Sequence, residues 1–116
     1  MRICAKCEVL KNEDEFYQKT KDKKHCYCKK CFNLYCMQRW IDKKIKFVEE
    51  KGGQCLDCNI QYNGKNLNIF EFHHIDPAYK KYDWNKLRLR SEESIKKELA
   101  KCDLLCANCH RMRHQQ

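Results

Sequence analysis

The sequence has little of what builds a large or membrane-bound protein. It contains no long apolar run and no signal-peptide pattern, so we expect no membrane partner and a cytoplasmic location, or the host-cell cytoplasm for a phage-encoded protein. Proline occurs once and glycine three times. At 116 residues an ordinary hydrophobic core would be thin, which favours a fold that is stapled by a metal or by disulfides.

Eleven cysteines can supply that staple. Their number is odd, and eight of them form four Cys-x2-Cys pairs, here called knuckles. A secreted disulfide framework has an even number of cysteines and follows a signal peptide. The pattern therefore predicts reduced, zinc-bound thiolates.

Acidic residues are scarcer than basic ones. Lys and Arg number 25 against 16 Asp and Glu, which gives a net charge of +9. Because Zn²⁺ with four thiolates is a unit of charge −2, two such sites would lower the total to about +5. The chain stays basic, which favours a polyanionic partner such as DNA.

The first two knuckles delimit an N-terminal module of residues 1–31. Their spacing is that of a four-cysteine zinc site, although His25 or Cys26 could replace one ligand of the second knuckle. Many lysines surround the module. They could form a platform that contacts DNA or a solvated basic loop, and the sequence leaves both interpretations open. The expected zinc ligands are Cys4, Cys7, Cys28 and Cys31, and the lysines are Lys19, Lys21, Lys23, Lys24, Lys29 and Lys30.

A helix is predicted to follow, over about Lys29 to Lys51, with residues 32–51 linking the two halves of the chain. The segment lacks proline and glycine until Gly52-Gly53, a natural helix stop. Its basic residues also allow a helix that lies along nucleic acid. The apolar stripe of this helix, at three- and four-residue steps, consists of Phe32, Tyr35, Cys36, Trp40, Ile41, Ile45 and Val48.

Residues 52–116 predict a second, mixed α+β domain. Leu67 to His74 is rich in β-formers and predicts a strand, with Asn63-Gly64 as a hairpin tip after a short strand at Gln61-Tyr62. Pro77 is expected to end regular structure and to begin a basic, aromatic loop over 78–90. A helix starting at Ser91, a short buried strand at Leu104-Leu105 and a helix over 108–115 complete the domain.

A second zinc set and a histidine cluster are predicted in this domain. The zinc set is closed, as a structural site should be, and consists of Cys55, Cys58, Cys106 and Cys109. His110 and His114 stand four residues apart and share one face of a helix, so both can bind one ion, with His73 as a third ligand. Positions left for water and phosphate oxygens are typical of a catalytic metal. The alternative is that all four histidines of this domain bind a purely structural zinc.

His74 is the candidate general base. An imidazole is partly neutral near neutral pH and can take a proton from water. Neighbouring residues of a straight strand point to opposite faces, so His73 and His74 reach one site only where the strand bends. The turn at Asp76-Pro77 makes such a bend reasonable.

Two stretches resemble the HNH endonucleases. Phe72-His73-His74-Ile75-Asp76-Pro77 and Leu104-Leu105-Cys106-Ala107-Asn108-Cys109-His110 are similar to the subgroup with a knuckle pair around the motif, over residues 52–116, and the N-terminal module resembles small phage and restriction nucleases. The resemblance implies a zinc-stapled ββα-metal (His-Me finger) core. It implies His74 as general base and a catalytic divalent ion, Mg²⁺ or Mn²⁺, at His73, His110 and His114.

The chain departs from the family's pattern at the motif's middle asparagine. That residue usually precedes the second knuckle, where this chain has Lys101-Cys102-Asp103, while Asn108 lies inside the knuckle and Asn85 in the loop. Asn108 is the candidate that orients the base.

The sequence thus predicts a metal-dependent endonuclease that hydrolyses DNA phosphodiester bonds. One site cuts one strand, so a double-strand break would need a homodimer or two successive nicks. A non-catalytic zinc-stabilised module that only binds nucleic acid is the alternative. The expected phosphate contacts are salt-sensitive and not sequence-specific: Lys80, Lys81, Arg88, Arg90, Arg111 and Arg113.

Overall fold

The computed structural model describes residues 1–114 as a small α+β protein with four helices and two two-stranded sheets in that range. Two compact units divide it, Met1–Ile41 and Asp42–Gln116. The boundary falls inside the long helix, whereas the sequence suggested boundaries at 31/32 and 51/52. Over the same residues, no helix has the length and apolar character needed to cross a membrane.

The first unit is built around cysteine. Strands β1 (Arg2–Ile3) and β2 (Leu10–Lys11) pair antiparallel, and a short 3₁₀ turn, Glu13–Glu15, follows. The buried residues are two cysteines and one aromatic ring: Cys4, Cys28 and Phe16. This core is very small, and two of its three buried residues are cysteines.

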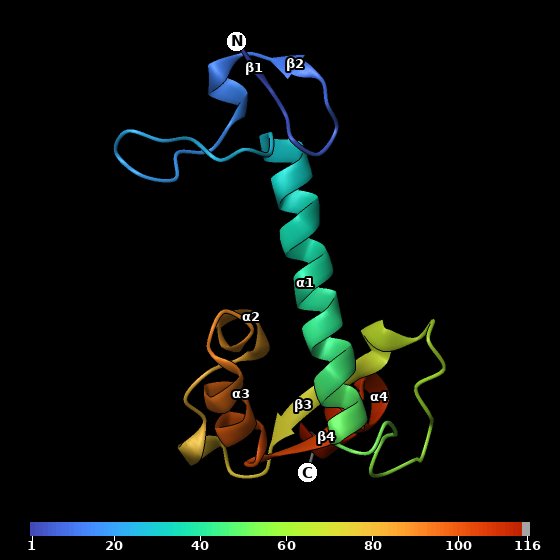
Figure 1. Cartoon of the computed structure of the whole chain (residues 1–116). Coiled ribbons are helices and arrows are strands. Elements are labelled where there is room, and N and C mark those ends of the chain that lie inside the picture. Colours follow the sequence, from blue (N-terminus) through green and yellow to red (C-terminus); the bar gives the residue numbers. More distant parts are fainter. Residues whose placement is uncertain (115–116) are drawn as a thin grey trace. The chain divides into compact units, whose positions relative to one another are not determined.

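Helix α1 (Lys29–Glu50) confirms the predicted helix and its stop (Figure 1). The amide of Gly53 donates to the carbonyl of Val48 and that of Gly52 to Glu49, at 2.9 and 3.1 Å, and both glycines have positive φ. This is the paired hydrogen-bond pattern of a glycine-terminated helix. The apolar stripe is buried only in part: Val48 is buried, but Tyr35 and Ile41 are exposed, because only the last turns of α1 meet the core of the second unit.

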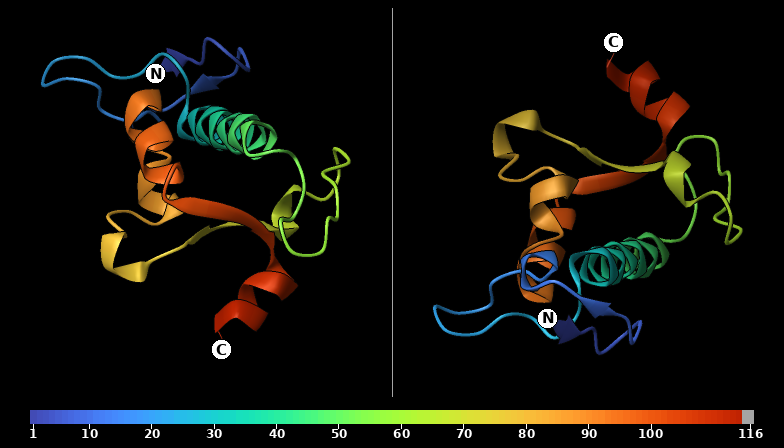
Figure 2. Two further views of the ribbon diagram at one scale, coloured as in Figure 1. Left: turned by 90° about the horizontal axis from the view of Figure 1, so that it is seen from below. Right: turned by 90° about the horizontal axis from the view of Figure 1, so that it is seen from above.

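The second unit is organised by one antiparallel strand pair. Strand β3 (Phe70–His74) pairs with β4 (Cys102–Cys106), so that His73 lies opposite Asp103 and His74 opposite Cys102. Figure 2 shows the two strands side by side, with helix α4 (Ala107–His114) leaving the end of β4. Residue 115, the last of the helix expected over 108–115, lies outside the described residues.

The predicted hairpin around Asn63-Gly64 was wrong. Gln61 forms an isolated bridge with Gln54 instead, and Leu67–Ile69 is a 3₁₀ turn, so the strand starts at Phe70. The physical reason is local: the side-chain oxygen of Asn63 accepts from the amides of Lys65 and Asn66, which closes the turn on itself. The partner strand of β3 is therefore β4, far along the chain.

The connection between the strands is more ordered than the predicted loop. Pro77 opens a 3₁₀ turn capped by Asp76 rather than ending regular structure, and helix α2 (Trp84–Leu87) begins at an Asp83 cap. Helix α3 (Glu92–Leu99) starts as predicted, since the Ser91 hydroxyl accepts from the amide of Ser94.

The core of the second unit lies between the sheet, the end of α1 and α3. One cluster joins α1, α2 and α3, and a second joins α1 to both strands. Period-two alternation then gives each face of β3 its own chemistry: Phe70, Phe72 and His74 face the core side, while Glu71 and His73 face α4. The clusters are Phe47, Leu87, Ile95, Leu99 and Cys102, and Val48, Phe70 and Leu104.

Candidate metal centres and histidine site

The first and third knuckles adopt the same turn in the two units. In each, the residue after the second cysteine has positive φ, 61° at Glu8 and 64° at Asn59, and its amide donates to the carbonyl of the first cysteine at 2.9 Å. The amide of that first cysteine donates to the carbonyl five residues on, at 3.1 Å for Cys4 and 2.9 Å for Cys55. The turn points both sulfurs of a pair to the same side.

The first four-cysteine group consists of Cys4, Cys7, Cys28 and Cys31. Cys28, and neither of the alternatives His25 and Cys26, completes it, since Cys26 is exposed and His25 packs on Phe32 with ring centroids 4.5 Å apart. Although burial alone would raise it, the pKa of Cys4 falls to about 6 because the amides of Cys7, Cys28 and Lys6 point at its sulfur. A thiol that is already a thiolate near neutral pH is a ready zinc ligand.

The second group consists of Cys55, Cys58, Cys106 and Cys109. Cys55 is fully buried, and amides of Cys106, Cys58 and Asp57 offset its burial and lower its pKa to about 6. Cys106 ends β4 and Cys109 lies in the first turns of α4, so an ion here would clamp the Cys55 knuckle to the junction of strand and helix. Both groups are compatible with structural zinc.

Three histidines gather beside this second group. One nitrogen from each of His73, His110 and His114 lies within 4.8 Å of the others, and the Nε2 atoms of His110 and His114 are 3.0 Å apart. His73 comes from β3, and the other two come from one face of α4. The three residues predicted to share an ion are thus brought together.

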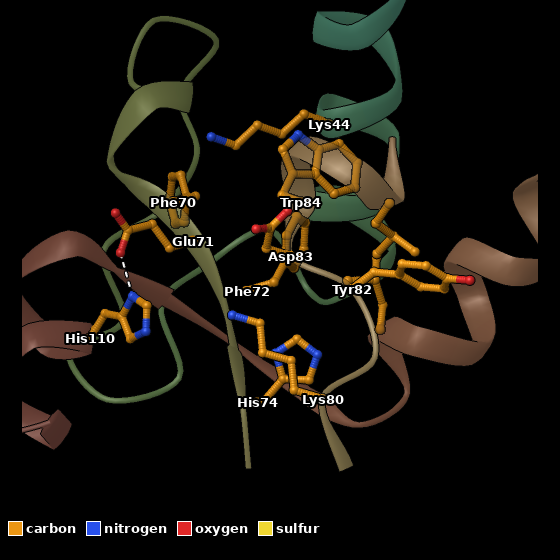
Figure 3. A pocket seen from close by; sticks show the side chains of 12 residues that line it. Lys44, Phe70, Glu71, Phe72, His74, Lys80, Tyr82, Asp83, Trp84 and His110 are labelled. Carbon is orange, nitrogen blue, oxygen red and sulfur yellow. Dashed lines mark hydrogen bonds and ion pairs between the residues drawn. The ribbon is translucent and has the colours of Figure 1, made fainter. Parts of the chain in front are cut away.

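Glu71 orients this cluster and was missed by the sequence analysis. Its carboxylate accepts a hydrogen bond from Nδ1 of His110, which leaves Nε2 of that ring for an ion (Figure 3). A carboxylate two residues before His73 on a strand shares its face, and this spacing could have identified it.

The electrostatics of the cluster favour a neutral ring at His73. Burial lowers the pKa of His73, and positive charge on His110, Arg113 and His114 lowers it further. A neutral imidazole has the free lone pair that a metal needs. Three nitrogen donors suit transition ions better than Mg²⁺, which prefers oxygen ligands.

His74 points away from the cluster and pairs with Glu98. The strand has no bend that turns both histidines to one face: Nε2 of His74 lies 2.9 Å from Oε1 of Glu98 in α3, and the two side chains are 10% and 4% exposed. Burial would raise the pKa of Glu98, but the amide of Lys81, His74, Lys101 and the amide of Tyr82 hold it at about 2.

Glu98 is the second residue that the sequence analysis missed. It falls on the apolar face of α3 with Ile95 and Leu99, and a carboxylate on such a face is the pattern that could have identified it. Asn108, the predicted orienting residue, is exposed in the first turn of α4, and the ring of His74 is hydrogen-bonded to Glu98 instead.

A cavity of about 310 Å³ lies between His74 and His110. His110 and Glu71 line one part of it and His74 another, with Phe72, Tyr82 and Trp84 as aromatic walls (Figure 3). His74 and one residue of the histidine cluster, His110, therefore line the same cavity.

The basic residues expected at DNA phosphates have different surroundings. Arg113 lies 2.6 Å from a carboxylate oxygen of Asp57 and 2.8 Å from one of Asp103, so internal ion pairs occupy it. Arg88 is half-buried at the end of α2. Lys81 and Arg90 lie over the ring of Tyr82, at 5.6 and 5.0 Å from its centroid. The expected residues that are exposed are Lys80, Lys81, Arg90 and Arg111.

Compared with protein-family models, with curated proteins and with solved structures, the chain gives no match.

Proposed function

We propose that the protein is a metal-dependent endonuclease of the HNH type that hydrolyses DNA phosphodiester bonds, with β3, β4 and α4 as its ββα-metal core. The observation that carries the proposal is the shared cavity. His110, one of the three clustered imidazoles, and the carboxylate-bound imidazole of His74 line one space of about 310 Å³. A purely structural zinc site would not need the fourth ring.

Glu98 gives His74 the tautomer of a base. With a pKa of about 2 this carboxylate is ionised at neutral pH and only accepts hydrogen bonds, so Nε2 of His74 carries the proton that it donates. The lone pair of the neutral ring is then at Nδ1, which takes a proton from the attacking water. The buried carboxylate also stabilises the imidazolium that forms.

His73, His110 and His114 are the residues that would hold the catalytic ion. Such an ion, when bound, neutralises charge on the scissile phosphate and on the leaving oxygen. The three nitrogen donors fit Ni²⁺ or Zn²⁺ better than the Mg²⁺ or Mn²⁺ suggested by the family. Glu71 fixes the ring of His110, so the cluster is held before any ion arrives.

The test is a supercoiled-plasmid assay of zinc-loaded wild type and His74→Ala, with Mg²⁺, Mn²⁺, Ni²⁺ or a weak chelator added. We expect wild type to nick or linearise DNA with a transition ion, and the variant to keep its structural zinc but lose about 10²–10⁴-fold in rate. His25→Ala, a histidine of the first unit that packs on Phe32, is the matched control. DNA binding without cleavage under every ion would favour the non-catalytic zinc module.

A further inference from the structure

The cavity contains more than hydrolysis requires. A base and an ion need only its polar end, yet Phe72, Tyr82 and Trp84 form aromatic walls, and the rings of Phe72 and Trp84 lie with centroids 5.2 Å apart. All three rings are partly exposed rather than buried. Partly open aromatic rings beside a phosphate-cleaving site fit a flat aromatic group on the substrate.

Lysines provide the charge that goes with such a group. Lys44 of α1 and Lys80 both line the cavity, and Figure 3 shows the side chain of Lys44 extending along it. Burial lowers the pKa of Lys44, and Glu71 is the acid that opposes this shift. In residues 1–114, neither lysine has a side-chain hydrogen bond or ion pair. The half-buried ammonium group of Lys44 can therefore bind an anion.

We propose that the cavity binds the base of an unstacked nucleotide next to the scissile phosphate, with Lys44 at a neighbouring phosphate, so that the protein prefers unpaired over fully paired DNA. This rests on the proposed function and names its substrate class. Two carboxylates, Glu71 and Asp83, also line the cavity, and Glu71 is already hydrogen-bonded to His110. The aromatic rings together with Lys44 and Lys80 match a nucleotide, which is a flat ring joined to an anion. In a paired duplex the faces of the bases are stacked on one another, whereas in a single strand they are free to stack on protein rings.

The experiment compares two strands that differ only in their bases. Trp40→Phe leaves Trp84 as the one tryptophan. This zinc-loaded protein is titrated with a short single strand carrying phosphorothioate linkages, which resist hydrolysis, and with an abasic strand of the same length and linkages. We expect the intact strand to quench Trp84 and to bind about tenfold tighter than the abasic strand.

Two variants sharpen the result. Trp84→Leu keeps an apolar wall and should bring the affinity for the intact strand close to that for the abasic one. Lys44→Gln should weaken both strands alike and lower the salt dependence by about one charge. Equal quenching and equal affinity of the two strands, or no change in Trp84 fluorescence with either, would overturn the proposal.

The plasmid assay separates this inference from the function on which it rests. Cleavage without base-dependent binding would overturn the proposed nucleotide pocket and support the nuclease function. Base-dependent binding without cleavage under any ion would support the nucleotide pocket and overturn the nuclease function. With both properties present, a duplex with an unpaired nucleotide should be cut about tenfold faster than its fully paired counterpart.

Discussion

The two units solve the problem of a thin core differently. The first buries two cysteines and Phe16, so an ion at its four sulfurs would replace most of a hydrophobic core. The second also has four clustered cysteines, but Phe47, Leu99 and their neighbours form an apolar core beside them. The same turn and the same ligands thus serve two purposes. In the first unit zinc would make the fold, and in the second it would fix the end of β4 against α4, where the histidines lie.

The largest expected effect is the loss of one ligand in the first unit. Structural zinc contributes about 10–16 kcal/mol in small domains, so Cys28→Ser should unfold the first unit while the second stays folded. Zinc bound to cysteine should fall from two ions to one for each chain. Amide spectra of the whole protein would follow both units, and Cys26→Ser, an exposed neighbour outside the group, is the control. Unfolding of both units in Cys28→Ser would contradict the view that only the first unit depends on this zinc site for its fold.

The second unit should be broken instead through its apolar core. Phe47 is buried at the centre of a cluster, and Phe47→Ala should destabilise this unit by about 3–5 kcal/mol even with zinc bound. Urea unfolding of zinc-loaded protein measures it, with Met37→Ala on an exposed part of α1 as the control. A much smaller effect would mean that zinc also dominates the second unit.

Acidification should test the thiolates of both units at once. The pKa values of Cys4 and Cys55 lie at about 6, below the ordinary thiol value of 9.0, so their stabilising contribution is complete above pH 9 and is lost as the pH falls through 6. Zinc release, measured with a colorimetric chelator, should rise as the pH is lowered below about 6. Glu98 stays ionised down to about pH 2, so its bond to His74 does not cause this release.

Glu98→Gln should affect catalysis more than folding. Glutamine keeps the size but not the charge that fixes the tautomer of His74, so kcat should fall about 10²-fold or more with KM little changed. The pH profile of kcat should also move, which a merely structural role would not cause. Glu93→Gln, an exposed acid in the same helix, should leave both unchanged.

The smallest effect separates two neighbouring arginines. Arg111→Gln should weaken DNA binding and reduce its salt dependence by about one charge, because Arg111 is exposed on α4. Arg113→Gln should leave the salt dependence nearly unchanged and lower the melting temperature slightly, since Asp57 and Asp103 occupy its guanidinium. Equal salt slopes for the two variants would contradict this assignment.

Patterns that depend on spacing were predictable, and contacts between distant segments were not. The knuckles, the stop at Gly52-Gly53 and the Ser91 cap are local rules, and each was confirmed. The gathering of His110 and His114 follows from their helical spacing. The pairing of β3 with β4 is a long-range choice, so the local preference of Asn63-Gly64 misled the prediction. Local patterns single out Glu98 and Glu71 as candidates, but their partners lie on other elements, so the contacts themselves do not follow from spacing.

The left-handed residue after the first and third knuckles has a consequence for sequence variation. Glu8 and Asn59 share a backbone conformation but not a side-chain chemistry, so selection on this turn acts on geometry. Glycine adopts that conformation at no steric cost, whereas a side chain there costs about 1 kcal/mol. Homologous chains should therefore carry Gly, Asn or Asp at these two places more often than Glu, whatever their other residues. The motif of these knuckles can therefore be extended by one position, the residue after the second cysteine, where the backbone has positive φ.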